Sequence, residues 1–136
     1  MKSLPRTDDP LRLRASFADE TAWTELCAAV QAPSGEEQFR AYVTPVSDRA
    51  YDGVSLEEVV STASETGHSF LFLADAISLE GPEHALLVVD LYQEPGRSFR
   101  TIPSEAWSVE NNLTLANIDF SDFTDAVDER GIFRGF

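Results

Sequence analysis

The stretch that decides the fold runs from residue 69 to residue 92, where Ser69–Asp75 has the sequence SFLFLAD and Ala85–Tyr92 has ALLVVDLY. Both segments are apolar at successive positions, which is typical of central strands that are covered on both faces. The nine residues between them are too few for the helical crossover that a parallel pair requires. We therefore expect two central strands that pair antiparallel.

A hairpin is predicted directly after these strands. In Glu94–Arg97, Pro95 and Gly96 occupy the two central positions of a type II turn. A tight turn at this point would place Tyr92 opposite Phe99 on the next strand. The same register would place Asp90 beside Thr101, and we expect Asp90 to bond to that residue or to an arginine.

Upstream, the first strand–helix unit is predicted from two periodicities. Leu11–Phe17 alternates apolar residues with Arg12 and Arg14, which indicates a strand with one face in water. Asp19 then has the position of a helix N-cap. The residues behind it that form the apolar stripe of an amphipathic helix are Trp23, Leu26, Cys27 and Val30.

A second strand–helix unit follows. Phe39–Val46 alternates as a strand, and Pro45 indicates that it ends there or lies at a sheet edge. Ser55 and Glu58 match a capping box at the start of a short helix, which Gly67 follows. Strands and helices that alternate at this spacing predict that the first three strands are parallel, with helical crossovers.

The last third of the chain, Thr101–Glu129, contains seven carboxylates and no lysine or arginine. We expect one helix from Pro103 to Asn112, with Trp107 on its inner side, and another from Asp119 to Gly131. The complete prediction is a single α/β domain over residues 1–136, with an irregular lead-in at 1–10. Its core is a mixed five-stranded sheet (β-α-β-α-β-β-β-α-α) with helices on both faces.

Composition excludes several classes of function. A net charge of −14 leaves no surplus of cations for nucleic acid or for anionic membrane surfaces. A single cysteine excludes an intrachain disulfide framework. The start of the chain has no apolar segment of the kind found in signal peptides, so we expect a cytoplasmic protein. Acidity either keeps the protein soluble or attracts a basic partner.

The predicted last helix separates its side chains cleanly. Phe120, Phe123 and Val127 lie on one side, and acidic residues recur every three positions on the other. Carboxylates spread in this way do not converge on one atom, so a protein-binding surface is favoured over a catalytic site. The residues predicted to bind a basic protein partner are Asn111, Asn112, Asn117, Asp122, Asp125 and Asp128.

The alternative is a metal-dependent enzyme or small-ligand binder at the carboxyl edge of the sheet. Aspartates follow the first three strands, and ligands of open α/β sheets bind at that edge. Oxygen ligands of this kind could hold Mg²⁺. The candidate ligands are Asp19, Asp48, Asp52 and Asp75. A pair of catalytic carboxylates from Asp75 and Asp90 is not expected, because antiparallel pairing places Asp75 beside Ala85, roughly 17 Å from Asp90.

Motifs for other chemistry are absent. His68 and His84 have no cysteine or histidine partner nearby for zinc. No serine has a G-x-S-x-G context, and neither a P-loop nor G-x-G-x-x-G occurs. The sequence predicts no cofactor and no catalytic residue.

Several blocks resemble a known family. They are Leu4–Pro10 (LPRTDDP), His68–Phe72 (HSFLF), Leu86–Tyr92 with Glu94–Arg97, Val109–Leu113 and Ala116–Phe120. Read together, they resemble a family of small acidic actinobacterial proteins known as a domain of unknown function. That resemblance implies no reaction, cofactor or site. The run Asn112–Phe120 has a short likeness to acidic immunity-type inhibitors that covers too few residues to count as a match. The acidic binding module is expected to be of immunity or regulatory type, and a structural or assembly subunit is a further possibility.

Overall fold

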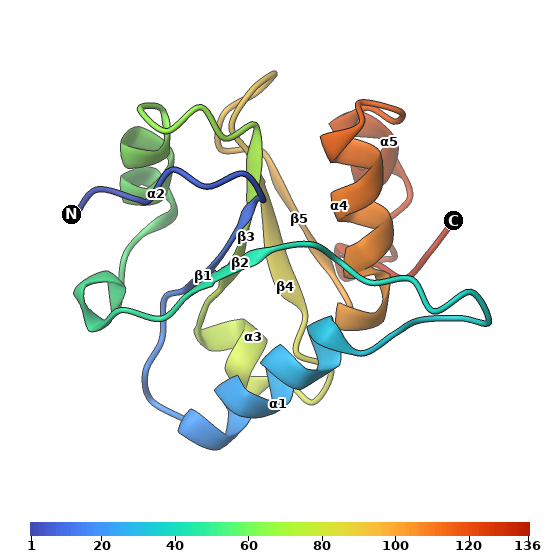
Figure 1. Cartoon of the computed structure of the whole chain (residues 1–136), viewed down its shortest axis with the longest axis horizontal. Coiled ribbons are helices and arrows are strands. Elements are labelled where there is room, and N and C mark those ends of the chain that lie inside the picture. The colour runs from blue at the N-terminus through green and yellow to red at the C-terminus, as the bar shows by residue number, and fades with distance from the viewer.

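The computed structural model describes all 136 residues as an α/β fold (Figure 1). The sheet has six strands in the order β2-β1-β3-β4-β5-β6, so the predicted α/β class and mixed sheet are confirmed and the predicted count of five strands is wrong. The elements are β1 (Leu11–Arg14), α1 (Glu20–Gln31), β2 (Thr44–Val46), η1 (Arg49–Tyr51), α2 (Leu56–Ala63), β3 (Phe70–Ala74), α3 (Ala76–Glu80), β4 (Leu86–Asp90), β5 (Ser98–Thr101), η2 (Pro103–Glu105), α4 (Ala106–Thr114), α5 (Phe120–Asp125) and β6 (Ile132–Phe133).

Strand directions agree with the sequence prediction. β1 lies parallel to both β2 and β3, while β3–β4 and β4–β5 are antiparallel. The unpredicted strand, β6, pairs parallel with β5 through Arg100 and Ile132, and so covers the far edge of the sheet. One short helix, α3, was also missed, because it occupies five of the nine residues that join two antiparallel strands.

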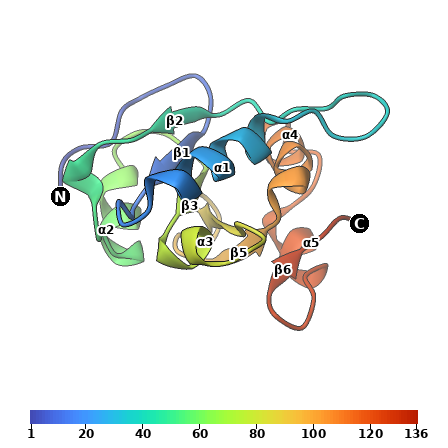
Figure 2. The same cartoon turned by 90° about the horizontal axis from the view of Figure 1, so that it is seen from below.

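Helices cover both faces of the sheet (Figures 1 and 2). The helices α1, α4 and α5 pack on one face, where 16 buried residues form the larger hydrophobic cluster. On the other face α2 packs with the lead-in, in a cluster of 10 residues that includes Leu4. The lead-in is irregular, as predicted, but Tyr51 donates a hydrogen bond to the Ser3 carbonyl and Leu4 is buried. Residues 1–10 are therefore part of the packed structure.

The prediction of one wet face on β1 is wrong. The side chains of Arg12 and Arg14 are 1% and 2% exposed, because α1 crosses over that face and places Trp23 above both guanidinium groups. Arg14 has partners: it donates to the Ser16 carbonyl and to Glu20. Arg12 has none at Nε or Nη1, and burial lowers the pKa of its guanidinium. The alternation of polar and apolar residues therefore predicts the strand correctly, but it does not predict that both faces of the strand are buried.

The segment before β2 is also different from the prediction. Only Thr44–Val46 forms a strand, whereas residues 39–43 extend toward α4. Phe39 stacks on Trp107 with ring centroids 4.4 Å apart, and the Tyr42 amide donates to Glu110. Trp107 is therefore half-buried against this segment, not in the core as predicted.

The β4–β5 hairpin has its predicted turn and a wrong predicted register. Arg97 N–H donates to the Glu94 carbonyl at 2.9 Å, and Gly96 has the positive φ of 96° that a type II turn needs. The strands, however, pair Val88 with Phe99. The difference arises because the chain leaves the ladder after Asp90, so residues 91–97 form a wide loop.

The aromatic residues of the last third hold it on the sheet. Phe99 of β5 stacks on Phe123 with ring centroids 5.5 Å apart and planes within 5° of parallel. Phe120 and Phe133 pack edge-on against the same Phe99 ring. Burying such rings stabilises by roughly 1.5–3 kcal/mol each. This aromatic cluster fixes α5 and β6 against β5.

The first testable expectation concerns Arg12. We expect Arg12→Met to raise the free energy of unfolding by about 1 kcal/mol or more, because desolvation of an unpaired guanidinium costs more than its cation–π contact with Trp23 returns. Arg14→Met, the matched control on the same face, should lower it, because Glu20 and the Ser16 carbonyl lose their donor. Urea unfolding measures the free energy of unfolding of both variants. An equal decrease in the two variants would contradict the expectation.

Candidate functional site

The turn between α4 and α5 is the centre of the candidate site. α4 continues to Thr114, past the predicted end at Asn112. Ala116 then has a φ of 54°, and the Asn117 amide donates to the Asn112 carbonyl at 3.0 Å, which closes the turn. Asp119 begins α5 through a capping box with Asp122, as the N-cap prediction required. The turn is thus held by hydrogen bonds at both ends.

α5 is shorter than predicted. It ends at Asp125, so the predicted extension to Gly131 is wrong. Asp128 lies in the following turn, where its carboxylate accepts the amides of Arg130 and Ile132 and the side chain of Arg134. The three-residue spacing of the carboxylates is therefore interrupted after Asp125, and only its first part lies on a helix.

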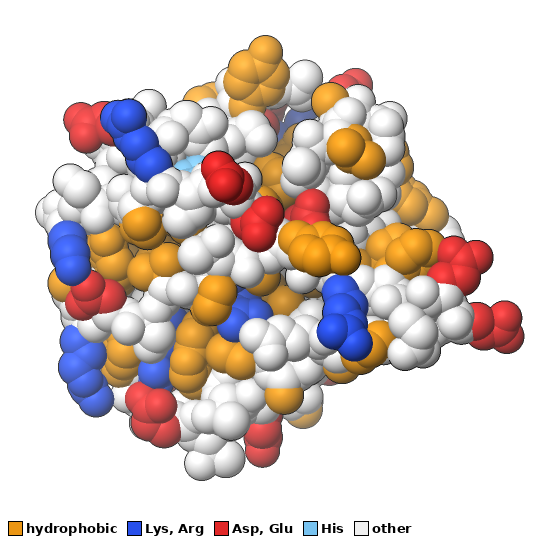
Figure 3. All heavy atoms as spheres, viewed as in Figure 1, with side chains coloured by type: hydrophobic (Ala, Val, Ile, Leu, Met, Phe, Trp, Pro, Cys, Tyr) orange, Lys and Arg blue, Asp and Glu red, His pale blue; other side chains and the backbone are white.

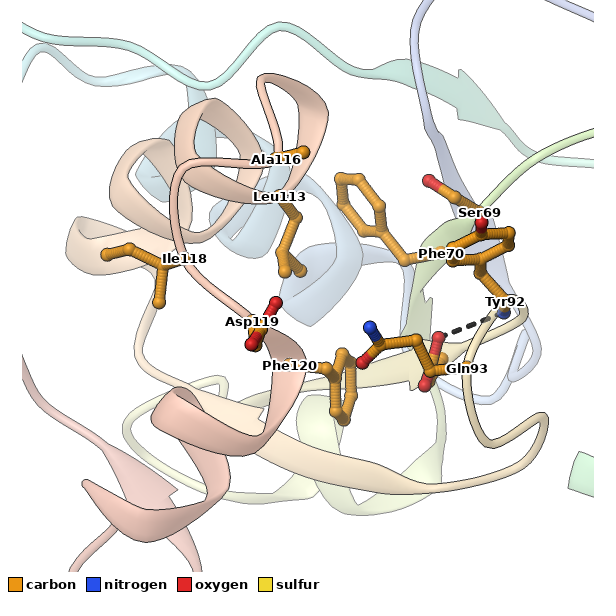
Figure 4. A pocket seen from close by; sticks show the side chains of 10 residues that line it. Ser69, Phe70, Tyr92, Gln93, Leu113, Ala116, Ile118, Asp119 and Phe120 are labelled. Atoms are coloured by element: carbon orange, nitrogen blue, oxygen red, sulfur yellow. Dashed lines mark hydrogen bonds between the residues drawn. The ribbon is translucent and has the colours of Figure 1, made fainter.

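A pocket lies between this turn and the loop that joins β4 and β5. In the space-filling view the surface is hollowed there, with apolar side chains inside (Figure 3). We call it the turn pocket; its empty space is about 450 Å³, counted out to open solvent. Its lining residues are Ser69, Phe70, Asp90, Tyr92, Gln93, Leu113, Ala116, Ile118, Asp119 and Phe120 (Figure 4). Six of the ten are hydrophobic, so the pocket has an apolar wall with polar groups at a few points.

Asp90 is the buried polar group of the turn pocket. Its side chain is 4% exposed and accepts the backbone amides of Tyr92 and Glu94, each at 2.9 Å. The prediction that it bonds to Thr101 or to an arginine is wrong, because the loop turns back over the carboxylate. No lysine or arginine of the chain pairs with it.

A second, shallower depression adjoins the turn pocket through Ile118, which lines both. We call it the acidic depression; it is lined by Ile118, Asp122, Asp125, Ala126 and Phe136. The Phe136 ring is 72% exposed and packs on Phe123 of the aromatic cluster. Two carboxylates therefore stand beside an apolar floor on the outer side of α5.

The structure brings some of the predicted partner-binding residues together and separates others. Asp122 and Asp125 share the acidic depression. Asn117 is exposed on the turn, and Asn111 is exposed on α4. Asn112 is used internally, since its side-chain amide donates to the Ser108 carbonyl.

Asp128 belongs to an ion-pair cluster of the chain itself. Arg134 donates to Asp128 and also to Glu83 in the loop before β4. The hydrogen bond from Arg134, together with the Ile132 amide, lowers the pKa of Asp128 to about 2. This cluster ties the C-terminal segment to the loop before β4, so the Asp128 carboxylate already has partners within the chain.

The four aspartates of the metal alternative are not brought together, and the structure contains no group of three or more residues that could hold a metal ion. Asp19 and Asp48 cap the starts of α1 and η1, and Asp48 also pairs with Lys2. Burial opposes ionisation of Asp75, but hydrogen bonds led by that from Arg100 outweigh it and hold the pKa of Asp75 below its usual range. Asp52 is exposed at the end of η1.

Sequence reasoning missed most of the turn pocket. The predicted hairpin keeps Asp90 and Tyr92 in a regular ladder, and the predicted strand Ser69–Asp75 is covered on both faces, which leaves no pocket beside Phe70. The available signal was Asp90 itself, because an aspartate that ends an apolar strand often accepts amides two residues further along the chain. That pattern would have predicted a loop at Tyr92, although not the turn that faces it.

Comparison with known proteins places the chain in a family. The sequence family described as "Domain of unknown function (DUF6924)" matches residues 9–136. The chain belongs to this family. No curated protein matches it. The family match covers every element that forms the turn pocket and the acidic depression.

None of the helices has both the length and the apolar composition that a membrane-spanning helix needs.

Acid stability tests the Asp128 cluster. The folded-state pKa of Asp128 is about 2 against an ordinary value of 3.8, so its contribution to stability is complete above the ordinary value and disappears as the pH falls through about 2. We expect Asp128→Asn to lower the melting temperature at neutral pH, and the difference from the parent chain to shrink as the pH is lowered across that window. A difference that stays constant with pH would contradict this assignment.

Magnesium tests the metal alternative. Because no three carboxylates gather, we expect millimolar MgCl₂ to leave the melting temperature unchanged relative to NaCl of equal ionic strength. A saturable rise that Asp75→Asn or Asp48→Asn removes would revive a metal site at the carboxyl edge.

Proposed function

We propose that this protein is a non-enzymatic binding module that engages a basic protein partner through the α4–α5 turn and the outer side of α5. The observation that carries the proposal is the acidic depression, where Asp122 and Asp125 flank an apolar floor that includes Phe136. Lysine and arginine side chains combine an aliphatic stem with a charged end. A depression with an apolar floor and carboxylates at its side is complementary to both parts.

Exposed apolar side chains support the same surface. Tyr92, Leu115 and Phe136 are 77%, 62% and 72% exposed, and they lie on the β4–β5 loop, the α4–α5 turn and the C-terminal segment. They are three of the seven large apolar side chains that the chain exposes, and Tyr92 and Phe136 line the turn pocket and the acidic depression. Aromatic groups of this kind are common anchors in interfaces.

Charge supports the choice of a basic partner. The net charge of −14 favours fast encounter with a cationic protein. The Asp125 side chain makes no hydrogen bond or ion pair within the chain, and the Asp122 carboxylate accepts one hydrogen bond, from the Asp119 amide of the capping box. Both carboxylates therefore keep free acceptor positions. An immunity-like inhibitor or a regulatory protein would use such a surface.

A matched pair of charge variants tests the proposal. We expect Asp122→Asn/Asp125→Asn to recover about 5- to 30-fold less of a basic partner in affinity capture, which corresponds to two exposed ion pairs of roughly 0.5–1 kcal/mol each. Glu36→Gln/Glu37→Gln removes the same charge from an exposed segment before β2 and should recover the partner as the parent chain does.

Quantitative mass spectrometry of the captured proteins gives the comparison. Equal losses in both variants would show that net charge alone attracts the partner. Undiminished recovery by the α5 variant would remove the proposed surface.

A further inference from the structure

We infer that the turn pocket receives a single arginine side chain of the basic partner, with its guanidinium directed toward Asp90. This inference rests on the proposed function and adds to the proposed surface a specific binding position for one arginine of the partner. The turn pocket and the acidic depression adjoin at Ile118, so one basic segment can reach both.

Asp90 has acceptor capacity that the chain leaves unused. Its carboxylate is 4% exposed and has two backbone amide donors but no cation. Each carboxylate oxygen can accept a further hydrogen bond. The one basic residue of the β4–β5 loop, Arg97, is directed elsewhere, since it donates to Thr124 and pairs with Glu94. The remaining acceptor positions of Asp90 are therefore not used by any cation of the chain.

The wall of the turn pocket is largely aromatic. Phe70, Phe120 and Tyr92 surround the space beside Leu113, and Asp119 stands at its rim (Figure 4). Aromatic faces attract a guanidinium by cation–π contact and allow its plane to stack. Lysine, a compact and strongly hydrated charge, gains less from such a wall. The wall favours arginine over lysine, and the two carboxylates exclude an anionic group.

Two polar side chains at the edge of the turn pocket are free to bind a ligand. The side chains of Gln93 and Ser69 line it and make no hydrogen bond within the chain. The Gln93 amide oxygen and the Ser69 hydroxyl can each accept from a guanidinium, which presents five donors. The donors of one arginine thus have several acceptors around them, in addition to Asp90.

The test uses the full chain, labelled with ¹⁵N, and a short probe peptide, acetyl-Gly-Arg-Gly-amide. We expect amide shifts at Tyr92, Gln93, Ala116 and Asp119 that saturate with peptide. The control peptide carries citrulline, which has the shape of arginine without its charge, and should bind about tenfold more weakly because charged hydrogen bonds are lost.

A pocket-filling variant provides the second control. Ser69 is exposed and its side chain makes no hydrogen bond, so Ser69→Trp should keep the fold while it occupies the mouth of the pocket. We expect this variant to lose the saturable shifts. It is preferable to Asp90→Asn, which would also disturb the loop that Asp90 holds.

The outcomes separate this inference from the proposed function. Shifts confined to Asp122, Asp125 and Ala126 would overturn the arginine pocket and leave the acidic depression as the binding surface. Equal binding of the arginine and citrulline peptides, or saturable shifts that persist in Ser69→Trp, would also overturn it. Absence of any localised shift would overturn the arginine pocket, while affinity capture with the α5 variant would still decide the proposed function.

Discussion

The stacking of Phe123 on Phe99 is the interaction on which the functional surface depends. α5 has six residues, fewer than an isolated helix needs for stability in water, so tertiary packing must supply what helix propensity does not. Phe123 is fully buried and parallel to Phe99, and the other rings of the aromatic cluster close around the same position. Because this side of α5 faces β5, its opposite side faces water. Asp122 and Asp125 are thus held outward mainly by a hydrophobic contact, to which Asp122 adds one hydrogen bond from the Asp119 amide.

The buried carboxylate of Asp90 has a similar role on the other side of the turn pocket. It accepts hydrogen bonds from the amides of Tyr92 and Glu94, and these bonds hold the chain after β4 in a loop. That loop forms one wall of the turn pocket, and the α4–α5 turn forms the other. A regular hairpin at this place would have continued the sheet and left no wall. Backbone hydrogen bonding at one aspartate therefore decides whether a pocket exists.

Local sequence patterns correctly predicted features that depend on neighbouring residues, such as helix caps and the apolar side of a helix. The N-cap at Asp19, the capping box at Ser55, the antiparallel central strands and the apolar side of α5 are all confirmed. The predictions were wrong where contacts between segments distant in the sequence determine burial or strand pairing. The guanidinium groups of β1 are buried because α1 covers them, and no periodicity within a strand reports what lies above it. β6 has two residues and forms only because β5 offers an unpaired edge. Of the candidate site, the acidic side of α5 was predictable from helical spacing, whereas the turn pocket needed the loop at Asp90.

We infer that the acidic side of α5 is a preformed surface, rigidly joined to the sheet by the aromatic cluster. Native-state hydrogen exchange tests it most directly. The Ala126 amide, bonded to the Phe123 carbonyl, and the Ile102 amide, bonded to the Phe133 carbonyl, report on α5 and β6. We expect both to open with a free energy within about 1 kcal/mol of the most protected amides of β3 and β4, as members of one cooperative unit. Exchange of these two amides at the rate of an unstructured peptide, with β3 and β4 still protected, would contradict the account.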